Sequence, residues 1–232
     1  MLVELDGVRL LTDPVLRRRV AQLRRTDTVD VRSLGKPDVV LISHGHYDHL
    51  DLPSLRLLGS ATRVIAPQKL AGRVAGFDAE GIEEGDELSI GSVRIRATHA
   101  EHEGGRPLFG DSPALGYAIL GSRRAYFAGD TDLFPGMSGL VPDLDVALVP
   151  IWGWGATLGR GKHLDPERAA EAVRRLAPRI AVPIHWGTYR PLHRRASARF
   201  LTEPAGAFAR AAAATAPEVE IRVLQPGEEL VV

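Results

Sequence analysis

Three histidines and one aspartate directly follow an apolar segment, and this feature most constrains the fold of the chain. Val39–Ser43 has the length and composition of a buried strand. It leads into His44, His46, Asp48 and His49, which form the pattern HxHxDH. Alternate side chains of a loop that leaves a strand can converge on one point, and imidazole and carboxylate groups bind metals such as zinc. The pattern therefore predicts a metal site at the end of a buried strand.

The number of potential ligands in this segment suggests two metals, because four close ligands exceed what one open catalytic site needs. A surface tract that scavenges metal, or a hydrogen-bonded turn, is the alternative interpretation. The chain has no cysteine, which excludes disulfides, thiolate metal sites, cysteine nucleophiles and iron–sulfur clusters. Imidazole and carboxylate therefore remain as the ligand types.

Length and charge favour an ordinary globular protein rather than a nucleic-acid or membrane protein. The chain has 232 residues, of which 44% are hydrophobic, and this suits one domain over 1–232. Basic and acidic residues balance at 29 each, so nothing global attracts nucleic acid or an anionic membrane. Neither a signal peptide nor a run of roughly 18 apolar residues is visible. We therefore expect a soluble, cytoplasmic protein.

Short apolar runs and a few helical patterns alternate along the chain. The predicted strands are Val39–Ser43, Arg63–Ala66, Val93–Thr98, Leu115–Leu120, Arg124–Ala128, Val146–Ile151, Ile180–Ile184 and Val219–Leu224. The predicted helices are Pro67–Val74, a segment that begins at Pro166 after an Asp165 N-cap, and Glu203–Ala214. Many strands with helices between them predict an α/β fold in which helices cover the sheets.

Residues 44–49 resemble the metal-binding motif of the metallo-β-lactamase superfamily. Two later strands end in matching residues. Arg124–Ala128 is followed by Gly129-Asp130-Thr131, similar to the superfamily's bridging aspartate, and Ile180–Ile184 is followed by His185, similar to its last histidine. The resemblance implies a four-layer αβ/βα sandwich, in which helices flank two mixed sheets and the site lies at one edge of the sheets.

The resemblance also implies a ligand set and a mechanism. One metal is expected to be held by His44, His46 and His102, and the other by Asp48, His49 and His185, with Asp130 bridging the two. The implied cofactors are two divalent ions, zinc first and manganese or iron as alternatives. The implied nucleophile is a metal-bound hydroxide, which Asp48 could orient and whose proton it could accept.

The third histidine of the first metal has two candidates, because His99 and His102 both follow the predicted strand Val93–Thr98. Similar sequences read Thr-Pro-Ala-x-His at this place. That pattern puts His102 at the ligand position and His99 at the proline position. We therefore favour His102 as the ligand and expect His99 to lie near the site.

A second resemblance concerns His163, which stands before Leu164-Asp165-Pro166. The subgroup that contains L-ascorbate 6-phosphate lactonase and N-acyl-phosphatidylethanolamine phospholipase D carries a similar His-x-Asp-Pro, and its histidine lies close to the active centre. His163 is therefore a candidate general acid or substrate contact. A histidine bonded to backbone at the helix entry is the alternative, and Asp165 is better explained as the helix cap.

Several aromatic and basic residues near these motifs are candidates for substrate contact: Trp152, Trp154, Tyr47, Tyr189, Arg106, Lys162 and Arg190. The tryptophans could wall a pocket, although core packing explains at least one of them equally well. The basic groups could bind a phosphate or carboxylate, and the tyrosines could donate to a developing oxyanion. For any one arginine, a solvated surface position is the simpler explanation.

The residues together predict a dinuclear metal-dependent hydrolase that cleaves a small ester, lactone or phosphodiester, including phosphorylated substrates. Two other classes of function remain open. One is an iron-dependent oxidoreductase on the same fold, and the other is a metal-binding protein without catalysis. Metal content separates the oxidoreductase from the others, and turnover separates the hydrolase from the binding protein.

Overall fold

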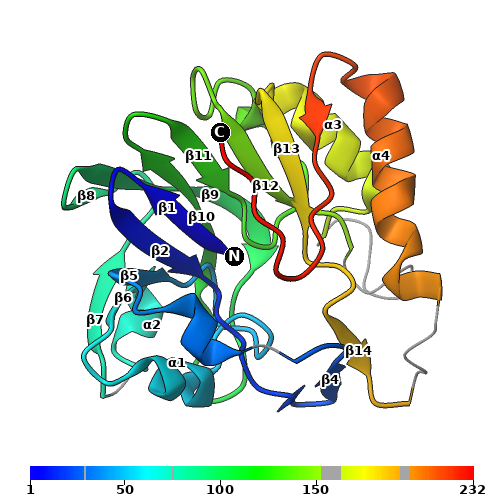
Figure 1. The fold of residues 1–232 in the computed structure, drawn as a ribbon. Helices are drawn as coiled ribbons and strands as arrows, with labels where there is room; N and C mark the ends of the chain where they lie inside the picture. The colour runs from blue at the N-terminus through cyan, green and yellow to red at the C-terminus, as the bar shows by residue number, and fades with distance from the viewer. Residues whose placement is uncertain (29, 75, 153–162, 194–198) are drawn as a thin grey trace.

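Two β-sheets form the centre of the chain in a computed structural model, which describes residues 1–28, 30–74, 76–152, 163–193 and 199–232 (Figure 1). The first sheet has the order β1 (Leu2–Leu5), β2 (Val8–Thr12), β5 (Val39–Leu41), β6 (Arg63–Pro67) and β7 (Asp78–Ile82). The second has the order β15 (Glu220–Ile221), β13 (Ile180–Ile184), β12 (Val146–Pro150), β11 (Arg124–Phe127), β10 (Pro113–Leu120), β9 (Val93–Glu103) and β8 (Glu87–Ile90). A small third sheet has the order β14 (Tyr189–Pro191), β4 (Leu23–Arg25) and β3 (Arg19–Val20).

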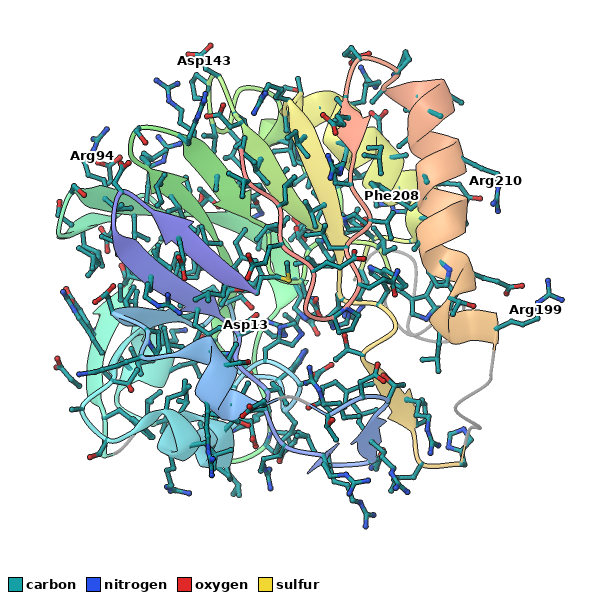
Figure 2. The ribbon with its side chains drawn as sticks, viewed as in Figure 1. Asp13, Arg94, Asp143, Arg199, Phe208 and Arg210 are labelled. Atoms are coloured by element: carbon teal, nitrogen blue, oxygen red, sulfur yellow. The ribbon has the colours of Figure 1, made fainter. Side chains whose placement is uncertain are left out.

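The two large sheets pack face to face, and helices cover their outer faces. Buried side chains of both sheets, such as Leu41 of β5 and Tyr117 of β10, share one hydrophobic cluster. Helices α1 (Leu52–Leu58) and α2 (Gln68–Ala71) pack on the first sheet, whereas α3 (Pro166–Leu176) and α4 (Glu203–Thr215) pack on the second (Figure 1). Figure 2 labels Phe208 of α4, which is fully buried in the outer cluster of the second sheet. The predicted αβ/βα sandwich is therefore confirmed.

The helix boundaries follow from capping residues. The Asp165 carboxylate accepts a hydrogen bond from the Arg168 backbone N–H at 2.8 Å, with Pro166 in the first turn, so the predicted N-cap of α3 is confirmed. Asp51 caps α1 in the same way through the Ser54 N–H at 3.0 Å. In the described part of the chain, no helix is both long and apolar enough to span a membrane.

The strand predictions differ from the structure mainly at the ends of the strands. Ile180–Ile184 is a strand as predicted, but Val93–Thr98 continues as β9 to Glu103. Its pairing with β10 continues beyond Thr98, where His99 lies opposite Leu115. His99 and His102 therefore lie within the strand, and the expectation that both follow it was wrong. Helix α2 is a single turn that stops before Val74 because Gly72 follows it.

Candidate metal centre

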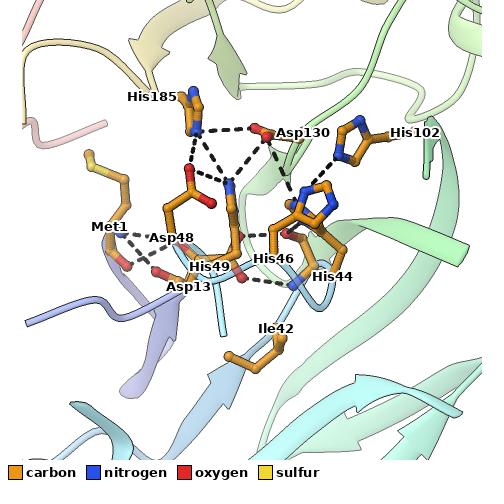
Figure 3. Close-up of polar contacts among 12 residues, drawn as sticks. Met1, Asp13, Ile42, His44, His46, Asp48, His49, His102, Asp130 and His185 are labelled. Carbon is orange, nitrogen blue, oxygen red and sulfur yellow. Dashed lines mark hydrogen bonds and ion pairs between the residues drawn. The ribbon is translucent and has the colours of Figure 1, made fainter. Parts of the chain in front are cut away.

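The candidate ligands come from the ends of strands in both large sheets and meet at one edge of the sandwich (Figure 3). Residues 44–49 follow β5 of the first sheet, while Asp130 follows β11 and His185 follows β13 of the second. His102 lies near the carboxyl end of β9. Parallel strands place their carboxyl ends on the same side, which brings these residues together from four separate parts of the chain.

One donor group consists of His44, His46 and His102. The His46 Nδ1 atom lies 2.9 Å from His44 Nε2 and 3.2 Å from His102 Nε2. One nitrogen from each of these residues lies within 4.8 Å of the others. His99 lies outside this group, because its side chain is 41% exposed and its Nδ1 is 3.0 Å from a Glu84 carboxylate oxygen.

A second donor group consists of Asp48, His49 and His185. The Nε2 atoms of His49 and His185 are 3.2 Å apart, and His185 Nε2 is 3.6 Å from Asp48 Oδ2. Each residue again offers one ligand atom within 4.8 Å of the others. Both donor groups contain histidines of the HxHxDH segment, so this short loop contributes to each of them.

Asp130 lies between the two donor groups and is only 2% exposed. Its Oδ2 atom is 3.2 Å from His49 Nε2 and 4.0 Å from His44 Nε2, and its Oδ1 atom is 3.5 Å from His185 Nε2. Oδ1 is buried without a hydrogen-bond partner. A buried carboxylate oxygen without a partner is costly, so its place among imidazole nitrogens fits a cation that would compensate it.

The outer nitrogens of three imidazoles are fixed by hydrogen bonds, which direct the inner nitrogens toward the centre. His49 Nδ1 donates to Asp13 Oδ2 at 2.7 Å, and His185 Nδ1 donates to the Trp152 carbonyl at 2.8 Å. The Ser43 hydroxyl donates to Asp13, so it accepts from His44 Nδ1 at 2.9 Å. In the neutral imidazoles, each Nε2 then presents a lone pair to the centre, and this donor set fits divalent cations.

Asp13 is the site residue that sequence reasoning missed. Its carboxylate accepts hydrogen bonds from the Ser43 backbone N–H at 2.7 Å, from the Ser43 hydroxyl at 2.6 Å and from His49 Nδ1. It therefore orients two candidate ligands while lying outside the donor groups. The signal that could have found it was the pair Asp13-Pro14, where the resemblance to the superfamily begins in motif order.

The electrostatics of the centre separate its imidazoles into two kinds. Burial, helped by the charge of His49, holds the pKa of His44 well below its ordinary value. Burial opposes protonation of His49 as well, but the carboxylates of Asp130 and Asp13 raise its pKa well above that value. The pKa of Asp130 is lowered despite burial, because His185 and His49 favour its ionised form. Burial also opposes ionisation of Asp48, whose pKa is nevertheless lowered by a hydrogen bond from His185.

His163 lies beside the centre, as the sequence suggested it would. Its Nε2 atom is 3.3 Å from Asp130 Oδ2, and its ring meets the His102 ring edge-on at 4.7 Å between centroids. Its Nδ1 atom is buried and has no hydrogen-bond partner among the described residues. In the structure, His163 is therefore not held by backbone at the helix entry.

A small cavity of ≈ 50 Å³ opens next to Asp48 and His185, and its other described walls are Trp152, Trp186, Gly187, Thr188, Tyr189 and Leu201. Tyr189 contributes its ring, because its hydroxyl donates to the Arg17 carbonyl at 2.8 Å. The Trp152 indole N–H is buried without a partner. Trp154 and Lys162, which were also candidates for substrate contact, lie outside the described residues.

The Arg106 guanidinium is occupied by contacts within the protein. It donates to the Leu50 carbonyl at 2.8 Å and lies 4.4 Å from the ring centroid of Tyr47 and 3.8 Å from that of Phe109. These contacts tie the loop after β9 to the HxHxDH segment. Arg190 lies in β14, opposite Arg24 of β4.

The paired donor groups lie at the edge of an αβ/βα sandwich and form a candidate metal centre. Residues 8–186 match the family described as Beta-lactamase superfamily domain. The chain belongs to this superfamily.

Known relatives and structures are similar over most of the chain. A protein named UPF0173 metal-dependent hydrolase from Methanopyrus kandleri is 32% identical, over 97% of this chain and 93% of that protein. N-acyl-phosphatidylethanolamine-hydrolyzing phospholipase D 1 of Caenorhabditis elegans is 29% identical, over 82% of this chain and 62% of that protein. The structure of Igni18, a metallo hydrolase from Ignicoccus hospitalis, has a TM-score of 0.73 and 25% identity, covering 98% of this chain and 91% of that one.

Proposed function

We propose that this chain is a dinuclear metal-dependent hydrolase that cleaves a small ester, lactone or phosphodiester. The observation that carries the proposal is the convergence of two donor groups on the buried carboxylate of Asp130. The names of the Methanopyrus kandleri and Ignicoccus hospitalis proteins support hydrolysis, and the name of the Caenorhabditis elegans relative supports phosphodiesters among the substrates.

In this proposal, the candidate ligands divide between two cations. His44, His46 and His102 would hold one, and Asp48, His49 and His185 would hold the other, with Asp130 reaching both. Two divalent cations, when bound, would lower the pKa of water toward neutrality and stabilise the negative charge that develops during hydrolysis. Zinc is the first candidate for a donor set of imidazoles and carboxylates.

The chain's own groups would position the attacking water and the leaving group. Asp48 stays ionised at neutral pH because its pKa is lowered, so it can accept a hydrogen bond from the attacking water and then its proton. His163 would donate a proton to the leaving-group oxygen from the opposite side of Asp130. Asp13, Ser43 and the Trp152 carbonyl would keep three imidazoles in the binding tautomer.

The cavity beside Asp48 and His185 suggests where the substrate lies. Its walls include the rings of Trp152 and Tyr189, which would shield an apolar part of the substrate from water. The unpartnered Trp152 indole N–H would donate to a substrate oxygen at this place. A small ester or lactone suits these walls better than an extended chain.

Hydrolysis of bis-p-nitrophenyl phosphate and of a panel of lactones and carboxylic esters tests the proposal. We expect turnover that is lost on chelation and restored by zinc or manganese. His46→Ala should abolish turnover and metal binding together, whereas His193→Ala, at an exposed histidine outside the donor groups, should change neither. Turnover that persists in His46→Ala, or bound metal without turnover of any ester, would contradict the proposal.

A further inference from the structure

The charge of the chain is balanced overall but unevenly distributed. Segments 17–25 and 188–193 together contain six arginines and no acidic residue, whereas the whole chain has 29 basic and 29 acidic residues. The structure brings these two distant segments together as neighbouring strands, β3, β4 and β14. A local excess of positive charge therefore exists that the net charge conceals.

The register of the three strands places arginines in a row. Arg19 of β3 lies opposite Arg24 of β4, and Arg24 lies opposite Arg190 of β14. Directly opposite residues share one face of a sheet. The other face carries Val20 and Leu23, which pack toward the protein in a small hydrophobic cluster. The row of arginines, which we call the arginine face, therefore points away from the core.

Two members of the arginine face, Arg19 and Arg24, lack a carboxylate partner among the described residues. Like charges directly opposite one another destabilise a sheet, so ion pairs would be expected here. Arg17 does pair with Asp51, and Arg25 donates to the Val15 carbonyl. In contrast, the exposed side chains of Arg18, Arg19 and Arg24 have no ion pair with any part of the chain that the structure describes. The nearest acidic residues along the chain are Asp27, which follows β4, and Asp13, which accepts hydrogen bonds from Ser43 and His49.

We propose that the arginine face binds the phosphodiester backbone of a polynucleotide. A guanidinium group binds a phosphate through two parallel hydrogen bonds. Neighbouring strands lie about 4.8 Å apart, so the row presents successive guanidinium groups to successive phosphates. No Trp, Tyr or Phe side chain is exposed among the described residues of this face, so the bases have nothing to stack on and binding is independent of sequence.

An anionic membrane is the less suitable partner. A protein element that lies on a membrane inserts apolar side chains in addition to presenting positive charge. In the described parts of the two segments, Leu192, with 42% exposure, is the one large apolar side chain that is exposed. The observations therefore favour a partner that offers phosphates without a hydrocarbon layer.

The three-stranded sheet adjoins the candidate metal centre through its inner face, which is opposite the arginine face. Strand β14 begins at Tyr189, shortly after His185, and Tyr189 lines the cavity beside that histidine. The Thr26 N–H, directly after β4, donates to the Thr188 carbonyl at 2.9 Å. A polynucleotide bound to the arginine face would lie on the outer side of this sheet, so its binding needs no metal and does not depend on the proposed hydrolysis.

Fluorescence anisotropy with labelled oligonucleotides of about 20 nucleotides, single-stranded and duplex, tests the proposal in metal-loaded and metal-free protein. We expect binding at about 50 mM salt that weakens steeply by about 200 mM. For the single strand, Arg19→Gln/Arg24→Gln should weaken binding by at least about tenfold at low salt and reduce the slope of log K against log salt by about 1.4. The fold should survive, because the change removes a like-charge contact.

Arg56→Gln/Arg73→Gln is the matched control, because it removes the same charge at two exposed arginines outside the three-stranded sheet. It should leave the affinity within about twofold and the salt slope unchanged. Equal losses in both double variants would overturn the proposal, since they would reveal an effect of net charge alone. Binding to phosphatidylglycerol vesicles without binding to either oligonucleotide would also overturn it.

Discussion

Two polar regions lie at opposite ends of the second sheet, and they differ in whether their side chains have hydrogen-bond or ion-pair partners. At the carboxyl end of β11, Asp130 lies among imidazoles beside a cavity of ≈ 50 Å³. At the other end, Arg94, Arg96 and Arg124 line a larger cavity of ≈ 410 Å³. Figure 2 shows Arg94 at the outer edge of the molecule, far from Asp13 at its middle.

The larger cavity is polar, yet its arginines already have partners. Arg94 pairs with Glu87 at 3.2 Å, Arg96 donates to the Leu140 carbonyl at 2.6 Å, and Arg124 pairs with Asp143 at 3.0 Å. At the candidate metal centre, next to the smaller cavity, Asp130 Oδ1 and His163 Nδ1 are buried without hydrogen bonds among the described residues. The comparison teaches that converging, unsatisfied groups indicate chemistry better than the volume of a cavity does.

The two histidines of β9 give the largest expected contrast, because His102 belongs to a donor group and His99 does not. His102→Ala removes a member of a donor group, so we expect it to lose bound metal and to lower kcat about 1,000-fold or more. His99→Ala removes an exposed imidazole paired with Glu84 and should keep both. Elemental analysis and kinetics of the two variants measure this. If His99→Ala lost the metal instead, the first donor group would be wrong.

His163 tests catalysis separately from metal binding. His163→Ala should retain the metal content of the wild type and lower kcat by about 100- to 10,000-fold, as expected for loss of a general acid. The loss should be smaller for substrates with a good leaving group, such as p-nitrophenolate, because these need no proton. A variant without metal would show that His163 is a ligand.

A substitution of Asp13 tests whether this carboxylate, which orients His49 and Ser43, contributes to metal affinity and turnover. Asp13→Asn should weaken metal affinity or turnover by about 10- to 100-fold, because the amide holds His49 and Ser43 less firmly. Asp27→Asn, an exposed aspartate after β4, is the matched control and should change neither. Equal metal affinity in the Asp13 variant and the wild type would contradict the orienting role.

The pH dependence of metal affinity follows from the raised pKa of His49 and His185 in the metal-free protein. Burial opposes protonation of both, but Asp130 raises both pKa values above the ordinary value of about 6.5. Metal must then displace protons at pH 7, so apparent affinity should rise with pH and keep rising above pH 6.5. Competition with a chelator between about pH 6 and pH 8 measures this. If the apparent metal affinity stopped rising near pH 6.5, the pKa values of His49 and His185 would not be raised.

The smallest effect is expected at the opposite end of the sheet. Arg94→Gln breaks an exposed ion pair with Glu87, which should cost less than about 1 kcal/mol of the free energy of unfolding. Turnover and metal content should remain those of the wild type. A large loss of turnover in Arg94→Gln would show that the larger cavity, and not only the centre at Asp130, takes part in the reaction.

The sequence predicted the parts of the fold that rest on local patterns. The αβ/βα class, the strand Ile180–Ile184 and the Asp165 cap could be predicted because apolar periodicity and capping act over a few residues. The end of β9 could not, because its pairing with β10 carries the strand through polar residues up to Glu103. The short β3 and β4 also escaped prediction, since their arginine-rich sequence lacks strand periodicity.

The candidate ligands were accessible from sequence because each follows, or lies in, a recognisable strand. Asp13 could not be found in this way, because its role depends on a contact with Ser43. The two residues are 30 positions apart in the sequence, and no local pattern encodes such a contact. The arginine face was hidden for the same reason, since β14 and β4 are far apart in the chain. Long-range pairing thus supplied what composition and motif could not.

The number of metal ions per chain shows whether the two donor groups that share Asp130 hold two cations. Elemental analysis of the purified protein after saturation with zinc and removal of excess should give about two ions per chain, falling to about one or none in Asp130→Ala. Wild-type protein that binds one ion or none, with Asp130→Ala unchanged, would contradict a centre in which two donor groups share one buried carboxylate.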